Sequence, residues 1–216
     1  MTEQFERLLD PAQRALFRSL DSPARIQALL DSIAYSTDEF NRCPLRVLQD
    51  GLANCFDGAL LAAAALRRIG HPPVIVDLLP EPGTDDEHTL AVFRQDGHWG
   101  AVAKSNFVGL RYREPIYRTL RELTLSYFES YFNVQGMKTL RSYRRSLNLA
   151  AFDRLGWMWS DAGVEAVVRR LEGRRPVALL TERMIAQLAP ADERSLAAGL
   201  LGADKAGLYV PGKDGP

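Results

Sequence analysis

The segment from Ala53 to Gly70, ANCFDGALLAAAALRRIG, restricts the fold of this chain more than any other. Every residue from Ala59 to Leu66 is apolar, so a helix formed here has no polar face. Such a helix has to be surrounded by protein on nearly every side. We therefore predict a central, buried helix that begins at residue 55, runs to 68 or 69 and stops at Gly70, because the HPP sequence that follows does not continue a helix.

The first turn of this helix carries a cysteine, Cys55. Asn54 is a good N-cap, and Asp57 places negative charge near the positive end of the helix dipole. The dipole stabilises a thiolate by about 0.3–1 kcal/mol, and by up to ~2 kcal/mol when the site is partly buried. This lowers the pKa of the thiol by only about one unit, so a catalytic Cys55 also needs a nearby imidazolium. Taken alone, Cys55 is more typical of buried packing.

Outside this helix, the pattern of apolar residues changes from helical to strand-like and back. β-Branched and aromatic runs predict three strands, and the Asp96-Gly97 pair between the last two is typical of a type I′ hairpin turn. Helical spacing predicts packing helices before and after the strands. The predicted strands are 73–79, 88–94 and 98–104, the predicted helices are 11–20, 23–36, 43–51, 115–133, 161–173 and 190–202, and residues 138–149 are predicted as a strand or an extended arm.

The composition excludes several kinds of protein. The chain has 27 basic and 27 acidic residues, so no overall field favours nucleic acid or an anionic membrane. Its start, MTEQFERLLDP, has no apolar run typical of a signal peptide or a membrane span, and we expect a cytoplasmic protein that does not bind membranes. The two cysteines, Cys43 and Cys55, are expected to be free thiols, and no metal or organic cofactor is implied.

Arginines and tyrosines are mixed between residues 111 and 145, a combination that can bind single-stranded nucleic acid or phosphate. Because the net charge of the chain is zero, we prefer to interpret these residues as a solvated face with internal ion pairs. Nucleic acid is therefore not an expected partner.

Of the three histidines, only His88 is placed where a strand end can meet the N-terminus of the Cys55 helix. His71 follows the C-terminus of that helix, ~20 Å or more from Cys55 at about 1.5 Å per residue. His98 follows the hairpin turn, where we expect an exposed loop tip. His88 is therefore the candidate base for Cys55.

The hairpin also predicts an orienting partner for His88. If Asp96 and Gly97 are the central turn residues, counting back along both strands places His88 opposite Ser105, and a turn one residue longer places it opposite Asn106. Asn106 is the better candidate, because its amide oxygen can accept a hydrogen bond from the imidazole and fix the tautomer. Ser105 is the alternative third member.

The segments NCFDGALLAAAALRRIGHPPVIVDL and HTLAVFRQDGHWGAVAKSN resemble the core of transglutaminase-like proteins, within the papain-like cysteine enzyme superfamily. The resemblance covers about residues 45–107 and rests on the order cysteine, helix, glycine, then histidine, strand, turn, tryptophan. It implies that Cys55 is the nucleophile, His88 the base and Trp99 a residue of the substrate cleft. Gln49 lies six residues before Cys55, the offset at which papain-like enzymes place an oxyanion-hole glutamine.

The chain departs from the family at one position. The family's aspartate would fall within 103–106, AKSN, where the sequence has no acid. Either Asn106 takes the orienting role, as in papain-like peptidases, or the site has lost its third member.

We therefore predict an α+β fold of the papain/transglutaminase-like type, with the cysteine-bearing helix packed on a small antiparallel sheet. Residues 1–135 are expected to form the core with its helical N-terminal part, and residues 136–216 a mostly helical extension packed on it. The leading functional prediction is thiol-dependent acyl chemistry on a peptide or other amide, with Cys55, His88 and Asn106 as catalytic residues and hydrolysis preferred over transamidation. The alternative is a noncatalytic binding module that keeps the fold without the aspartate.

Overall fold

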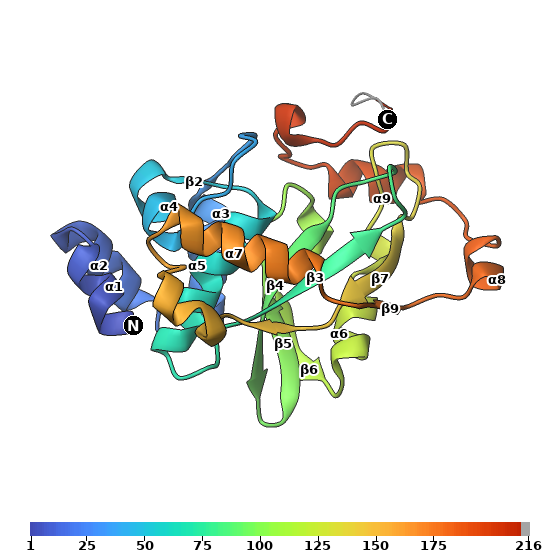
Figure 1. Ribbon diagram of the computed structural model, residues 1–216. Helices are drawn as coiled ribbons and strands as arrows, with labels where there is room; N and C mark the ends of the chain where they lie inside the picture. The colour runs from blue at the N-terminus through green and yellow to red at the C-terminus, as the bar shows by residue number, and fades with distance from the viewer. Residues whose placement is uncertain (213–216) are drawn as a thin grey trace.

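The computed structural model describes residues 1–212, which form a mixed arrangement of helices and strands (Figure 1). The α-helices are α1 (Thr2–Leu8), α2 (Pro11–Ser19), α3 (Pro23–Ser32), α4 (Pro44–Asp50), α5 (Cys55–Arg68), α6 (Leu120–Leu125), α7 (Asp161–Glu172), α8 (Glu182–Ile185) and α9 (Glu193–Gly199). Short 3-10 helices are η1 (Val108–Leu110), η2 (Phe128–Ser130), η3 (Leu149–Leu155) and η4 (Lys205–Gly207). The strands are β1 (Ala34–Tyr35), β2 (Leu52–Ala53), β3 (Val74–Pro80), β4 (His88–Gln95), β5 (His98–Val102), β6 (Arg113–Tyr117), β7 (Leu140–Arg144), β8 (Leu147–Asn148) and β9 (Pro176–Ala178).

Helix α5 is the buried helix that the sequence predicts. All residues from Phe56 to Leu66 are buried. The side chain of Asn54 accepts a hydrogen bond from the Asp57 backbone N–H at 2.9 Å, and the Asp57 carboxylate accepts one from the Asn54 N–H at 3.3 Å. Beyond the C-terminal end of the helix, Gly70 has a φ of 95°, a conformation that glycine adopts without strain. The predicted cap, burial and end of this helix are confirmed.

Within the described residues, seven strands form one antiparallel sheet in the order β6-β5-β4-β3-β7-β9, with β8 beside β3. The predicted hairpin between β4 and β5 is confirmed, because Gln95 pairs with His98 and the two turn residues have φ values of 48° and 80°. Pairing between β4 and β5 ends at Ala91 and Val102. His88, at the start of β4, therefore extends past β5 and pairs only with β3.

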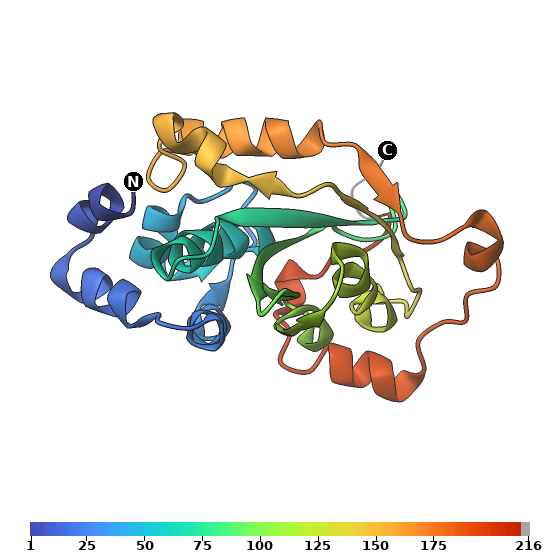
Figure 2. The same ribbon diagram turned by 90° about the horizontal axis from the view of Figure 1, so that it is seen from below.

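The sheet separates two hydrophobic cores. Ile75, Ala91 and Phe93 pack on one face with α5, the N-terminal helices and α7, whereas Leu78 and Leu90 pack on the other with the segment around α6 and η2. Figure 1 shows α1 to α5 gathered at one end of the molecule, and Figure 2 shows α7 and α9 on opposite sides of the sheet. Since successive side chains of a strand point to opposite faces, His88 points away from the face that packs on α5.

Three predicted helices are clearly shorter than the sequence indicates, among them 190–202, of which α9 covers Glu193–Gly199. Residues 115–133, predicted as one helix, hold the end of β6, then α6 and η2. Strand β6 pairs with β5, and Thr119 caps α6 by accepting a hydrogen bond from the Glu122 N–H at 3.1 Å, so the helix begins only after the strand ends. Likewise, α3 ends at Ser32 because the chain continues into β1, which pairs with β2.

The segment after residue 136 contributes strands to the main sheet. Residues 138–149 are predicted as a strand or an extended arm, and the strand alternative holds for β7 and β8 within this range. Strand β7 pairs with β3, and β9 pairs with β7 at the sheet edge. The sheet that carries His88 is therefore completed by residues far from it in sequence.

Candidate functional site

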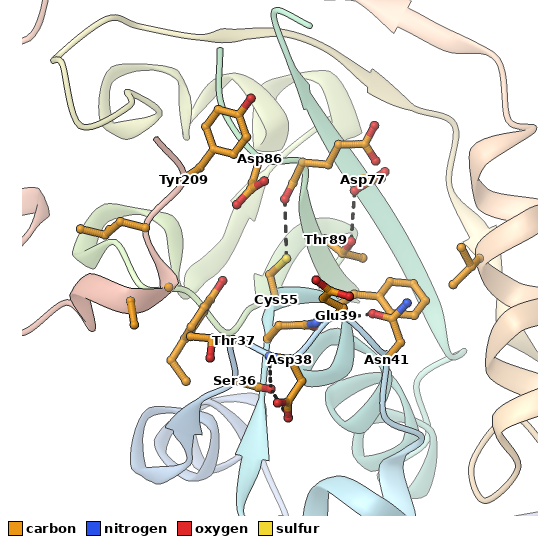
Figure 3. Close-up of a pocket in the computed structure, with 18 of the residues that line it drawn as sticks. Ser36, Thr37, Asp38, Glu39, Asn41, Cys55, Asp77, Asp86, Thr89 and Tyr209 are labelled. Atoms are coloured by element: carbon orange, nitrogen blue, oxygen red, sulfur yellow. Dashed lines mark hydrogen bonds between the residues drawn. The ribbon is translucent and has the colours of Figure 1, made fainter. Parts of the chain in front are cut away.

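Cys55 is half-buried at the first position of α5, where the N-terminus of the helix meets the start of β4. Its Sγ lies 3.6 Å from the carbonyl oxygen of Glu87, the residue before β4 (Figure 3). Cys55 lines two cavities: a cleft of about 680 Å³, and a smaller cavity of about 40 Å³ that it shares with His88. The larger one is called the cleft below.

The charged side chains that line the cleft are acidic. Among the described residues, those lining it include no lysine, arginine or histidine. Arg42 and Arg144 form ion pairs with some of these acids, but both are largely buried and do not line the cleft. The acidic lining residues are Asp38, Glu39, Asp77, Asp86, Glu87 and Glu172.

These surroundings raise the pKa of the Cys55 thiol to about 12. Burial is the largest cause; a hydrogen bond from the Thr89 backbone opposes it, and the negative charges of Asp77, Asp86 and Asp57 add to it. Together, burial and the acids outweigh the helix N-terminus, which is worth about one unit. In the free protein at neutral pH Cys55 is therefore a thiol rather than a thiolate.

His88 is buried and lines the smaller cavity together with Cys55. Its Nε2 lies 2.7 Å from the carbonyl oxygen of Leu110 in η1. Because a carbonyl oxygen can only accept, Nε2 carries the ring proton and donates a hydrogen bond to this oxygen. Among residues 1–212, no hydrogen-bond partner occupies Nδ1, which keeps its lone pair. Burial lowers the pKa of His88 to about 4; the Leu110 carbonyl opposes this shift and the positive charge of Arg113 adds to it. The imidazole is therefore neutral and held as one tautomer.

The residues predicted to orient His88 are engaged elsewhere. The Asn106 amide donates to the backbone oxygen of Asp204 at 2.8 Å and accepts from the backbone N–H of Asp204 at 2.7 Å. Ser105 Oγ accepts from the Phe107 N–H at 3.0 Å. Both line the smaller cavity, but within the described chain neither hydrogen-bonds to His88. The orienting position is occupied by the Leu110 carbonyl instead.

The reason is that the chain leaves β5 and docks on α3. The Gln27 side chain accepts from the Ala103 N–H at 3.0 Å and donates to the Ala103 carbonyl at 2.9 Å, so these backbone groups are not available to β4. Lys104 is buried, and its Nζ donates to the Leu30 carbonyl at 2.9 Å and to that of Ile33, at the C-terminal end of α3. The hairpin register that placed Ser105 or Asn106 opposite His88 therefore does not extend that far.

Gln49 and Trp99 lie outside both cavities. Gln49 is exposed on α4. Trp99 lies beside the hairpin turn, at the opposite end of β4 and β5 from His88, and its ring is covered by the Arg94 guanidinium at 5.2 Å. The structure does not bring either residue to Cys55, so neither is positioned as an oxyanion donor or a cleft wall.

Sequence reasoning did not anticipate three contributors to the site. The Leu110 carbonyl is a backbone group, and no residue-type signal could have identified it. Tyr35 and residues 206–210 line the cleft beside Cys55, although both are remote from it in sequence. Tyr35 follows α3 closely, and its position depends on the pairing of β1 with β2.

Replacing Asp77 with asparagine is expected to lower the pKa of Cys55, because it removes one of the negative charges that raise that pKa. Asparagine keeps the oxygen that accepts from Thr89 Oγ1, at 3.0 Å in the native chain. The measurement is the pH dependence of Cys55 alkylation, followed by mass spectrometry of the cysteine peptides. Glu172→Gln, which changes a cleft acid that does not contribute to the shift, is the matched control. A profile that stays in place or moves to higher pH in Asp77→Asn contradicts this account.

No protein-family model and no curated protein matches this sequence. Among solved structures, the chain is similar to Legionella pneumophila LapG, with 15% sequence identity, a TM-score of 0.37, and coverage of 48% of this chain and 72% of that chain. The EGTA-treated form of LapG has 16% sequence identity and a TM-score of 0.37, with coverage of 48% of this chain and 69% of that chain. The calcium-bound form has 14% sequence identity and a TM-score of 0.37, with coverage of 48% of this chain and 70% of that chain. Likeness at this TM-score carries no argument about the function of this chain.

Two further observations concern residues 1–212 only. None of their helices combines the length and the apolar character needed to cross a membrane. Nor do they contain a group of three or more histidine, cysteine, aspartate or glutamate side chains arranged to hold a metal ion.

Proposed function

We propose that this protein is a thiol-dependent acyl-transfer enzyme of the papain/transglutaminase-like type that acts on an amide bond. The observation that supports the proposal is the shared cavity of Cys55 and His88, in which Leu110 holds the imidazole with its proton on Nε2. This tautomer leaves the Nδ1 lone pair without a partner among the described residues, and in the proposal Nδ1 is the atom that takes the proton from the thiol. A backbone carbonyl thus takes the orienting role that an aspartate has in the family.

In the proposed reaction, Cys55 Sγ attacks the carbonyl carbon of the substrate while the thiol proton passes to His88 Nδ1. The tetrahedral intermediate collapses with cleavage of the C–N bond, and the imidazolium returns the proton to the leaving amine. Water then hydrolyses the thioester, with His88 again acting as the base. An amine in place of water would give transamidation.

The acidic cleft favours a substrate that carries positive charge near the reacting amide. In the free protein, a thiol pKa of about 12 and an imidazole pKa of about 4 keep the proton on sulfur. A cation bound beside Asp77 and Asp86 would offset two of the charges that disfavour the thiolate. We therefore propose that the substrate itself completes the activation of Cys55.

A noncatalytic binding module is the second candidate. The same two pKa shifts favour it, because they oppose the thiolate–imidazolium pair in the free protein. Under this hypothesis, Cys55 and His88 are packing residues at the base of a cleft that binds a cationic ligand.

Alkylation of Cys55 by iodoacetamide distinguishes the two candidates. If His88 is the base, His88→Gln is expected to slow alkylation of Cys55 at neutral pH by about a hundredfold, the lower end of the effect of a general base. Glutamine can still donate to the Leu110 carbonyl, so the variant removes Nδ1 but keeps that hydrogen bond. His98→Gln, at the hairpin turn, is the matched control. Equal alkylation rates in the native protein and in His88→Gln would rule out the catalytic pair.

A further inference from the structure

The segment 204–210, called the strap here, passes beside Cys55. It begins at Asp204, includes η4 and ends at Val210. Its residues from Ala206 to Val210 line the cleft, and Gly207 and Tyr209 also line the smaller cavity that holds Cys55 and His88. In Figure 3, Tyr209 lies on the other side of Cys55 from Asp77. One wall of both cavities is thus formed by chain that is remote from the rest of the site in sequence.

The strap is held at its start by a side chain of the site. The two hydrogen bonds between the Asn106 amide and the Asp204 backbone fix the position at which the strap enters. Asp204 Oδ1 also accepts from the Ala206 N–H at 3.0 Å, which starts η4. Asn106 and His88 both line the smaller cavity, so this contact joins the strap to the part of the site that holds His88.

A second contact seats the strap on Tyr35. A Cβ added to Gly207 would lie 2.7 Å from Tyr35 Cδ1 and 3.2 Å from Asn106 Nδ2. The backbone of the strap therefore approaches the ring so closely that only glycine fits without movement. Tyr35 lines both cavities, so displacement of the strap from the Tyr35 ring would open both cavities where Gly207 now lies.

Little else among the described residues fixes the strap. Ala206 and Val210 are exposed, Lys205 is exposed and makes no side-chain hydrogen bond or ion pair, and no β-strand pairing includes these residues. The helix before it is better anchored, because Gly199 of α9 packs against Phe132 and Phe107. The described contacts therefore hold α9 more firmly than the strap.

From these contacts we propose that the strap is a displaceable lid on Cys55, latched by Asn106 and seated on Tyr35. It narrows access to the thiol in the free protein, and a substrate reaches Cys55 when the latch opens. The inference rests on the proposed function only in taking Cys55 as the reactive group. Access to the thiol can be measured without any catalytic activity.

The test compares modification of Cys55 by a small reagent, iodoacetamide, and a bulky one, a fluorescein maleimide, in the full chain. Asn106→Leu removes both latch hydrogen bonds at similar side-chain size and is expected to raise the maleimide rate by about tenfold, the equivalent of one or two hydrogen bonds. Gly207→Val is expected to act in the same direction by displacing the strap from Tyr35. In both variants the iodoacetamide rate rises less than the maleimide rate, because a lid restricts a bulky reagent more.

Lys205→Gln, which alters the exposed side of the strap, is the matched control and leaves both rates unchanged. Cys43 is 1% exposed and serves as an internal check, since its modification would report general unfolding. If the maleimide rate of Cys55 is the same in Asn106→Leu, Gly207→Val and the native protein, the strap is a fixed wall and not a lid. That result would not affect the proposed pairing of Cys55 with His88, which is tested separately by the iodoacetamide alkylation rate of His88→Gln.

Discussion

Replacing Arg144 with methionine is expected to lower the free energy of unfolding by about 3 kcal/mol above neutral pH, the size typical of breaking a buried ion pair. Arg144 Nη1 forms ion pairs with Asp77 Oδ2 and, at 2.6 Å, with Glu87 Oε2. The Asp77 side chain is only 3% exposed, so water cannot replace the guanidinium. Methionine keeps much of the aliphatic volume while it leaves the buried carboxylate without its counter-charge.

The loss is expected to depend on pH. Burial and the nearby negative charge of Glu87 already raise the pKa of Asp77 from 3.8 to about 7, although Arg144 opposes the shift. Without Arg144 this pKa rises further, so the folded state binds more protons than the unfolded state over a wider range. The free energy of unfolding therefore falls as the pH increases, and it falls further in Arg144→Met than in the native protein. At a pH below about 4, where Asp77 is protonated in both states, the two proteins should differ least.

Urea denaturation at a series of pH values measures this difference. The double variant Asp77→Asn/Arg144→Met is the control, because it removes the buried charge together with its partner and is expected to recover most of the lost stability. The account is wrong if Arg144→Met is equally destabilising at all pH values, or if the double variant is no more stable than Arg144→Met.

The second large effect concerns His88. Its pKa is about 4 in the folded protein, against an ordinary value of 6.5, because burial disfavours the imidazolium. Between these pH values the unfolded state binds more protons than the folded state. The contribution of His88 to the free energy of unfolding is therefore complete above pH 6.5 and is lost as the pH falls toward 4. At about 1.36 kcal/mol per pKa unit, the total loss is about 3 kcal/mol.

His88→Gln is expected to remove this loss. Its free energy of unfolding, compared with that of the native protein at each pH, should improve by about 3 kcal/mol between pH 6.5 and 4. Asp57 and Asp85, whose burial raises their pKa values to about 6, titrate in the same range but are common to both proteins and cancel in the comparison. His98→Gln tests whether removing any histidine has this effect. A difference between native and His88→Gln protein that stays constant across this range would show that His88 is not held neutral by burial.

Most of the local structure around Cys55 was predictable from sequence. The apolar run within α5 required a buried helix, and Asn54 and Asp57 identified its capped start. The Asp96-Gly97 turn set the register of β4 and β5, which holds as far as Ala91 and Val102. These features follow from residues within a few positions of one another, because caps and tight turns are formed by neighbouring backbone groups.

The composition of the site could not be predicted in the same way. Asn106 was the expected partner of His88, but its amide binds Asp204, 98 residues away, and Gln27 takes the Ala103 backbone from 76 residues away. The pKa of Cys55 depends on how deeply it is buried and on acids from three separate segments, which no local pattern reports.

By itself, the sequence determined that a cysteine opens a buried helix beside an antiparallel hairpin with a histidine at its open end. Only the tertiary structure decided that the Leu110 carbonyl orients His88, that the cleft is acidic and that the strap forms one of its walls. The physical reason is that hydrogen bonds and charges between remote segments depend on how those segments pack, whereas helix burial and turn geometry are encoded in short stretches of chain.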